Sequence, residues 1–196
     1  QGWRATPSGQ SAMPIHLTPA QIDAALPKVA IGLQQYLWLQ SRLQAENALS
    51  DPEFRRRFNH FYRVRRGPSW QNAFYDIMSR AKREHLSFDV VLGLLAQETG
   101  RYEASFTSKL IATLDPHKPV IDSVVLKNLG LRLPAARSAT RADKLRELYA
   151  KIQSLFLAYL QSEDGSYLVS AFCRAYPEAH VSNEKKLDLV LWQTRG

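Results

Sequence analysis

The chain has 196 residues, of which 45% are hydrophobic and 22% are charged. This length and composition suggest one domain that buries a core of its own. No apolar run approaches the roughly 18 residues that a membrane-spanning helix needs, so we expect no membrane partner. The single cysteine, Cys173, rules out an internal disulfide, and we expect it to be a small buried residue in a cytoplasmic protein.

The charge is concentrated in one region. The chain carries a net charge of +8 and has a pI near 9.7. Residues 51–85 contain nine basic and four acidic side chains, and aromatic residues interleave with the arginines. Such a pattern favours a polyanionic partner such as nucleic acid, although a charge run is also typical of a solvated helix face.

The first two thirds of the chain are predicted to be helical, because apolar residues recur at intervals of three and four. Thr18 followed by Pro19 marks the start of the first helix, which Pro27 kinks or divides. The helices predicted after it cover residues 51–64, 68–83, 87–99, 104–114 and 122–129, and Gly100 and Gly130 end the fourth and the sixth.

Three more helices are predicted in the last third. Thr140 is expected to cap a long helix, the segment "SEDGS" to form a turn, and residues 167–176 to form a short helix. Asn183 is expected to cap the closing helix, in which Trp192 is a core residue. No pair of alternating segments is joined by a hairpin turn. The predicted fold class is therefore all-α, a compact bundle of about eight helices.

The domain organisation is simple. We expect residues 1–16, whose composition differs from the rest, to be a disordered lead, and residues 17–196 to form a single helical domain. The five histidines are scattered without metal-ligand spacing, and there is no glycine-rich phosphate loop. We therefore expect neither a metal nor a cofactor, and we interpret His60 as a packing residue.

One segment carries recognisable chemistry. In "KPVIDSVVLKNLGL", residues 118–131, a proline-bounded extended stretch leads to Asp122 at the start of an apolar helix. An Asp in this position is a good N-cap, worth about 1 kcal/mol, and the helix dipole keeps it ionised. The same fixed anion would stabilise the positive charge that develops on a sugar when its glycosidic bond breaks. The local pattern by itself favours the cap.

With the helix before it, this segment resembles the corresponding part of the helix–hairpin–helix DNA glycosylases, over about a sixth of the chain. The resemblance implies an all-α glycosylase-like fold, base excision, a cytoplasmic DNA-repair setting and Asp122 as the catalytic carboxylate. "TGRYEAS", residues 99–105, is the nearest candidate for the hairpin and has one glycine. Strand-cleaving members carry a lysine at the start of this helix; Ser105 is the residue closest to that position, and Lys109 lies one turn later. The resemblance therefore implies a monofunctional enzyme in which Lys109 contacts phosphate.

Such an enzyme turns its target nucleotide out of the duplex into a pocket. Candidates for the pocket lining or the wedge are aromatic residues, although each is also typical of a helical core: Trp70, Phe74, Tyr75 and Tyr102. Gln97 and Glu98 could read a base edge or activate water, or could be a polar helix end. The predicted DNA contacts are basic or hydroxyl side chains: Arg63, Arg65, Arg66, Arg101, Ser105, Thr107, Ser108, Lys109 and Lys118.

Together these features predict a monomeric DNA glycosylase that hydrolyses the N-glycosidic bond of a modified or damaged base and leaves an abasic site. Its compactness suggests the further hypothesis of a defence enzyme that acts on modified phage DNA. Two alternatives stay open. One is a non-enzymatic helical DNA-binding or regulatory protein in which Asp122 is only a cap. The other is an interaction module whose basic face meets an acidic protein.

Overall fold

The computed structural model describes residues 14–194, which form ten α-helices and two short 3₁₀ helices and contain no strand. The elements in chain order are α1 (Pro19–Ala25), η1 (Leu26–Val29), α2 (Ala30–Leu43), η2 (Ala48–Ser50), α3 (Pro52–Phe61), α4 (Pro68–Glu84), α5 (Phe88–Thr99), α6 (Ala104–Leu114), α7 (Ser123–Leu129), α8 (Arg141–Leu160), α9 (Glu163–Ala175) and α10 (Asn183–Trp192). The all-α class is confirmed for this part of the chain.

Most helix boundaries follow from local signals in the sequence. Thr18 forms a complete capping box with Gln21, and Pro27 lies in η1, which separates α1 from α2. Gly100 and Gly130 end α5 and α7 with φ of 77° and 64°, the left-handed conformation that glycine adopts without strain. The predicted division at Pro27 and both glycine stops are confirmed.

Three expectations about the last third are wrong, and one is met in position only. Thr140 stands at the N-cap of α8 as predicted, but its side chain makes no cap hydrogen bond. The segment "SEDGS" is the start of α9 and not a turn, because Ser162 Oγ accepts a hydrogen bond from Gly165 N at 3.1 Å. Ser182, and not Asn183, caps α10 through Lys185 N. Cys173 lies exposed on α9 instead of being buried.

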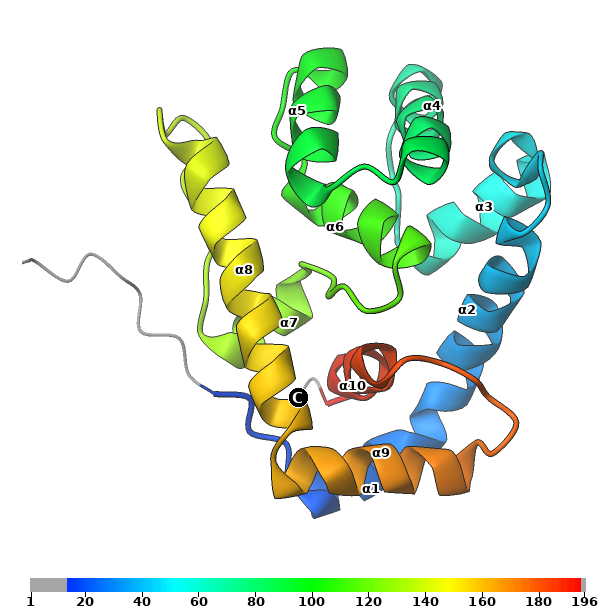
Figure 1. Cartoon of the computed structure of the whole chain (residues 1–196), viewed down its shortest axis with the longest axis vertical. Helices are drawn as coiled ribbons and strands as arrows, with labels where there is room; N and C mark the ends of the chain where they lie inside the picture. Colours follow the sequence, from blue (N-terminus) through cyan, green and yellow to red (C-terminus); the bar gives the residue numbers. More distant parts are fainter. Residues whose placement is uncertain (1–13, 195–196) are drawn as a thin grey trace, which may run out of the picture.

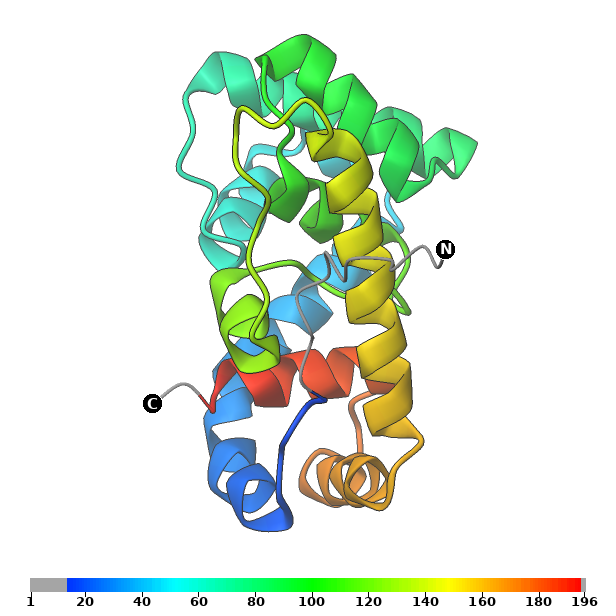
Figure 2. The ribbon, with the colours of Figure 1, turned by 90° about the vertical axis from the view of Figure 1, so that its left-hand side faces the viewer.

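Helix α10 lies near the middle of the molecule, and the other helices are arranged around it (Figure 1). It packs against α1, α7, α8 and α9, and every residue from Lys185 to Leu191 is buried. Turning the molecule by 90° shows α8 running along one side past the end of α10 (Figure 2). A helix buried on all sides is normally apolar, whereas α10 carries charged residues into the interior.

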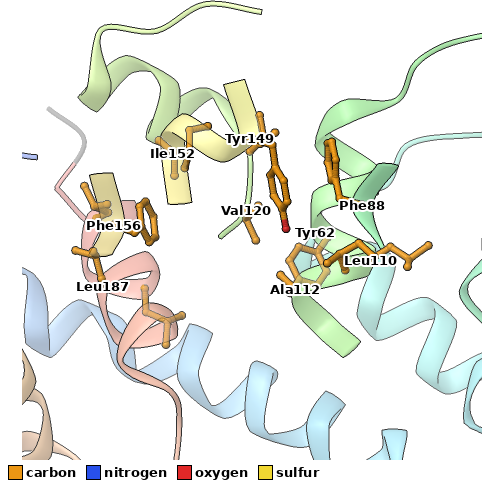
Figure 3. Close-up of a cluster of buried hydrophobic side chains, with 14 of the residues drawn as sticks. Tyr62, Phe88, Leu110, Ala112, Val120, Tyr149, Ile152, Phe156 and Leu187 are labelled. Atoms are coloured by element: carbon orange, nitrogen blue, oxygen red, sulfur yellow. The ribbon is translucent and has the colours of Figure 1, made fainter. Parts of the chain in front are cut away.

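One continuous hydrophobic core joins these helices. Figure 3 shows part of it, where Phe88 of α5 stacks on Tyr149 of α8 with ring centroids 3.9 Å apart. The core reaches the start of the described chain, since Ile15 is only 7% exposed. The expected boundary at residue 16 therefore lies too late, and the rest of the expected lead, residues 1–13, lies outside the described residues.

The contact between α8 and α9 depends on a residue without a side chain. A Cβ atom at Gly165 would lie 2.0 Å from the Tyr159 carbonyl oxygen and 2.7 Å from Leu160 Cα. Both atoms belong to backbone and cannot turn away. We therefore expect Gly165→Ala to lower the free energy of unfolding by about 1–3 kcal/mol, measured by urea denaturation.

Gly93 in the middle of α5 provides the matched control. A Cβ atom there meets no heavy atom within 4 Å among the described residues. Alanine is the better helix former, so Gly93→Ala should raise the free energy of unfolding by about 0.5–1 kcal/mol. If Gly165→Ala were as stable as the unsubstituted protein, the close approach of α9 to α8 would be refuted.

Candidate functional site

The carboxylate of Asp122 is held by donors from two helices. Its Oδ1 accepts a hydrogen bond of 2.8 Å from Val125 N, which makes Asp122 the N-cap of α7. Its Oδ2 accepts a hydrogen bond of 3.0 Å from Trp192 Nε1 at the end of α10. Both oxygens are therefore fixed, and the carboxylate cannot rotate without losing one of these bonds.

Asp122 lines a cleft of about 1140 Å³. The cleft lies between the start of α2, the end of α3 with the residues after it, and helices α6, α7 and α10. The ionisable side chains that line it are Lys28, His60, Arg63, Arg65, Lys109, Asp122, Lys185 and Asp188. Lysine and arginine outnumber aspartate in this set. The cleft therefore carries an excess of positive charge, which suits an anionic ligand.

Lys109 and Ser105 reach the same cleft from α6. They are four residues apart and so share one face of the helix, and both line the cleft with Asp122. Lys109 Nζ donates a hydrogen bond of 2.9 Å to the Tyr62 carbonyl oxygen and lies 5.0 Å from the centroid of the Phe106 ring. These contacts hold the ammonium group at the cleft wall.

Lys185 and Asp188 form an ion pair on α10. Lys185 Nζ donates to Asp188 Oδ2 at 2.9 Å, and the Lys185 side chain is only 6% exposed. The ammonium also lies 4.6, 5.3 and 5.7 Å from the ring centroids of Tyr36, Phe61 and Tyr62, which stabilise it by cation–π attraction. The other oxygen, Asp188 Oδ1, is buried and has no hydrogen-bond partner among the described residues.

These surroundings shift the pKa values of the charged groups. Burial raises the pKa of Asp122, and the Asp188 carboxylate raises it further. The Val125 and Trp192 hydrogen bonds and the Lys109 ammonium oppose this. Burial lowers the pKa of Lys109, against the attraction of Asp122. The expectation that cap geometry alone keeps Asp122 ionised is therefore incomplete, because burial and a like charge act against it.

Arg63 and Arg65 lie on the rim of the cleft, on the segment after α3. Arg63 adopts the left-handed conformation, with φ of 55°, which is uncommon for a residue with a side chain. Its guanidinium carbon lies 4.6 Å from the centroid of the Trp192 ring. Arg66 instead forms an ion pair of 3.1 Å with the largely buried Glu103, so part of its charge is already neutralised.

The predicted aromatic pocket is wrong for two of its residues. Phe74 and Tyr75 are both 0% exposed, because the buried face of α4 places them in the core. Trp70 is half-buried and stacks on Phe74 with ring centroids 5.2 Å apart, which is also a packing position. The aromatic residues that do line the cleft are Phe61, Tyr62 and Trp192.

Three predicted phosphate contacts are also placed elsewhere. Thr107 and Ser108 are 0% exposed and are bonded inside the protein. Thr107 Oγ1 donates to the Glu103 carbonyl oxygen, and Ser108 Oγ accepts a hydrogen bond of 2.8 Å from Ile121 N. Lys118 lines a second cleft of about 770 Å³ between α4, α6 and α8. The predictions for Thr107 and Ser108 are wrong, and Lys118 is separate from the Asp122 cleft.

The connection between α5 and α6 carries the remaining predicted residues. Arg101 and Tyr102 are exposed on this short turn, and Tyr102 is 40% exposed. Gln97 and Glu98 are exposed at the end of α5, outside the lining of the cleft. The turn joins two helices as a hairpin would, and these four side chains are accessible to a ligand outside the cleft.

Helix α10 supplies a part of the site that was not predicted from the sequence. Trp192 is not a core residue as expected, but a half-buried donor to Asp122. Lys185, Asp188 and Trp192 stand at spacings of three and four, so they share one face of the helix. The available signal was the spacing of Lys185 and Asp188, opposite charges three residues apart on one helix, because buried charges need a partner.

Comparison with protein-family models, with curated proteins and with solved structures returned no match for this chain. Within residues 14–194, no group of three or more His, Cys, Asp or Glu side chains is arranged to hold a metal ion. No helix in this described range is both long and apolar enough to cross a membrane. The function therefore has to be argued from the cleft itself.

Breaking the buried ion pair should cost more stability than replacing both of its members. Lys185→Met leaves Asp188 as a buried carboxylate without its counter-charge, so we expect a loss of about 3–5 kcal/mol in the free energy of unfolding. The double substitution Lys185→Met with Asp188→Leu removes both charges and should recover most of that loss. Urea denaturation of the three proteins measures both. Equal losses in the single and double variants would contradict this account of the pair.

Proposed function

We propose that this protein is a monofunctional DNA glycosylase of the helix–hairpin–helix type, which hydrolyses the N-glycosidic bond of a modified or damaged base. The observation that carries the proposal is the carboxylate of Asp122, fixed by Val125 N and Trp192 Nε1 in the wall of a basic cleft. The likeness of residues 118–131 to these glycosylases and the net charge of +8 support it.

The reaction requires a fixed anion near the sugar. As the bond between C1′ and the base nitrogen breaks, its electron pair leaves with the base and positive charge develops on the sugar. A carboxylate that is already oriented stabilises this charge without reorganisation. A water molecule positioned by Asp122 then attacks C1′, and the proton that it loses neutralises the departing base, which leaves the free base and an abasic site. The protein's own residues supply these roles, and the step needs no cofactor.

The rest of the cleft supports the same ligand. Arg63, Arg65 and Lys109 place positive charge where the phosphates beside a turned-out nucleotide would lie. Phe61, Tyr62 and Trp192 offer aromatic surface for the base. The exposed turn between α5 and α6, with Arg101 and Tyr102, is available for the duplex beside it.

One observation favours a second candidate activity, in which the enzyme also cleaves the strand. Lys109 lies in the same cleft as Asp122, and burial lowers its pKa, so a larger share of its amine is neutral than for an exposed lysine. After the base has left, a neutral amine can condense with the C1′ aldehyde of the abasic sugar and form a Schiff base, with loss of water. Strand cleavage without alkali would identify this activity and would replace the monofunctional assignment.

The central test compares the unsubstituted protein with the Asp122→Asn variant. Both are incubated with DNAs that carry different modified bases. Asp122→Asn removes the charge but keeps an oxygen that can accept from Val125 N, so we expect base release to fall by 10²-fold or more while binding to DNA persists. Mass detection of the free base and alkali treatment of the abasic strand measure the product. Asp89→Asn, on α5 beside the second cleft, is the matched control and should leave the rate unchanged.

The outcomes separate the alternatives. Base release at the wild-type rate in Asp122→Asn would restrict Asp122 to a structural cap. Binding to DNA without release of any tested base from the unsubstituted protein would favour a non-enzymatic DNA-binding protein. Binding to an acidic protein but not to DNA would favour the interaction module. Binding to DNA is recognised by its salt dependence, since phosphate contacts release the counterions of DNA.

The pH dependence follows from the charges around Asp122. Catalysis needs the ionised carboxylate, and its pKa is raised above the ordinary 3.8, so base release should increase with pH through a midpoint above 3.8. The Lys109 ammonium lowers this pKa, so Lys109→Met should move the midpoint to higher pH. Lys118→Met, in the second cleft, should leave it unchanged. A midpoint that moved down in Lys109→Met would contradict the assignment.

A further inference from the structure

Two exposed rows of side chains lead away from the mouth of the Asp122 cleft, one on α2 and one on α3. On α2, Ile31, Trp38 and Arg42 are seven and four residues apart and therefore share one face of the helix. On α3, Arg56 and Arg57 lie one turn before His60. Ile31 and His60 line the cleft, and the two helices pack side by side (Figure 1). We refer to Ile31, Trp38, Arg42, Arg56, Arg57 and His60 as the α2–α3 track.

Trp38 holds two of the arginines in place. Its ring packs against the core, while the guanidinium carbons of Arg57 and Arg42 lie 4.1 and 5.4 Å from its centroid. Stacking on an aromatic ring uses the face of a guanidinium and leaves its N–H edge available. Because the ring is anchored, both arginines lose little freedom when they bind a phosphate.

The charges on the track suit an anion. Arg42, Arg56 and Arg57 are all exposed, and the acidic residue beside them on α3 is Glu53. Glu53 pairs with Arg57 at 3.0 Å and with Arg56 at 4.0 Å. Exposed pairs of this kind contribute little free energy, so a phosphate can compete with Glu53 for both arginines. Ile31, 72% exposed at the cleft mouth, adds an apolar contact for a sugar or base.

We infer that the α2–α3 track is a second DNA contact, separate from the α5–α6 turn, which binds the phosphates of the strand that flanks the nucleotide in the cleft. The inference rests on the proposed function, since it takes DNA as the ligand. From Ile31 to Arg42 the helix rises about 16 Å, which matches roughly five nucleotides of one strand. The track is therefore long enough to follow the strand beyond the cleft.

The test compares two charge-matched double variants. Arg42→Ala with Arg57→Ala removes two positive charges from the track, and Lys144→Ala with Lys151→Ala removes two from the exposed face of α8, on the opposite side of the molecule (Figure 1). Each pair is introduced into Asp122→Asn, so that no turnover occurs. Affinity for a labelled duplex is measured by fluorescence anisotropy over a range of salt concentrations.

The track variant should bind about tenfold more weakly, and its slope of log K against log salt should fall by about 1.4–1.8, the value for two lost phosphate contacts. The α8 variant should keep the affinity and slope of Asp122→Asn. Shortening the duplex on one side of the target to fewer than about five nucleotides should abolish the difference, because the track then has no strand to bind. A second variant, Arg42→Gln with Arg57→Gln, keeps more of the packing and should give the same loss.

The track is refuted if both arginine variants bind with the affinity and slope of Asp122→Asn, or if the α8 variant loses as much. Failure to bind DNA at all refutes both the track and the proposed function. Loss of binding in the track variants, in a protein that releases no base from any DNA, would support the track and refute only the glycosylase. The opposite result is base release from short duplexes by the unsubstituted protein, with unchanged affinity of the track variants for long duplexes. It would support the glycosylase and refute only the track.

Discussion

The ion pair between Lys185 and Asp188 is the constraint on which the candidate site depends. A buried ammonium and a buried carboxylate each lose several kcal/mol of hydration, so α10 can lie at the centre of the molecule only if the two charges meet. The rings of Tyr36, Phe61 and Tyr62 complete the surroundings of Lys185 and tie α10 to α2 and α3. The position of this helix along its axis is thereby set.

The same constraint reaches Asp122 through one turn of helix. Trp192 follows Asp188 by four residues, so a fixed α10 places the indole N–H at Asp122 Oδ2. Asp188 also raises the pKa of Asp122, against the two hydrogen bonds and Lys109. If Asp122 acted only as a helix cap, the neighbouring Asp188 carboxylate would not improve that cap. The opposition of these effects at one side chain supports a functional role, because perturbed ionisation is concentrated at functional sites.

Most helices were predictable from the sequence. Which face of each helix packs in the core and which lines the cleft was not. The boundaries of α6, the Gly100 stop and the cap at Asp122 depend on a few neighbouring residues, so local chemistry determines them. Phe61 and Phe74 stand in similar helical patterns, yet the first lines the cleft and the second is in the core. Periodicity separates Ser105 and Lys109 from Thr107 and Ser108, but only tertiary packing decides which pair is buried.

The distribution of the basic residues explains why composition alone could not locate the ligand. Lys185 and Arg66 are already paired with carboxylates, so their charges do little for an incoming anion. Arg63 lies over Trp192, and Arg42 and Arg57 of the α2–α3 track lie over Trp38. An aromatic anchor orients a cation without neutralising it, whereas a carboxylate does both. The positive charge left for an anionic ligand is therefore the charge that no buried carboxylate neutralises, and Arg63 over Trp192 and Arg42 over Trp38 are two examples of it.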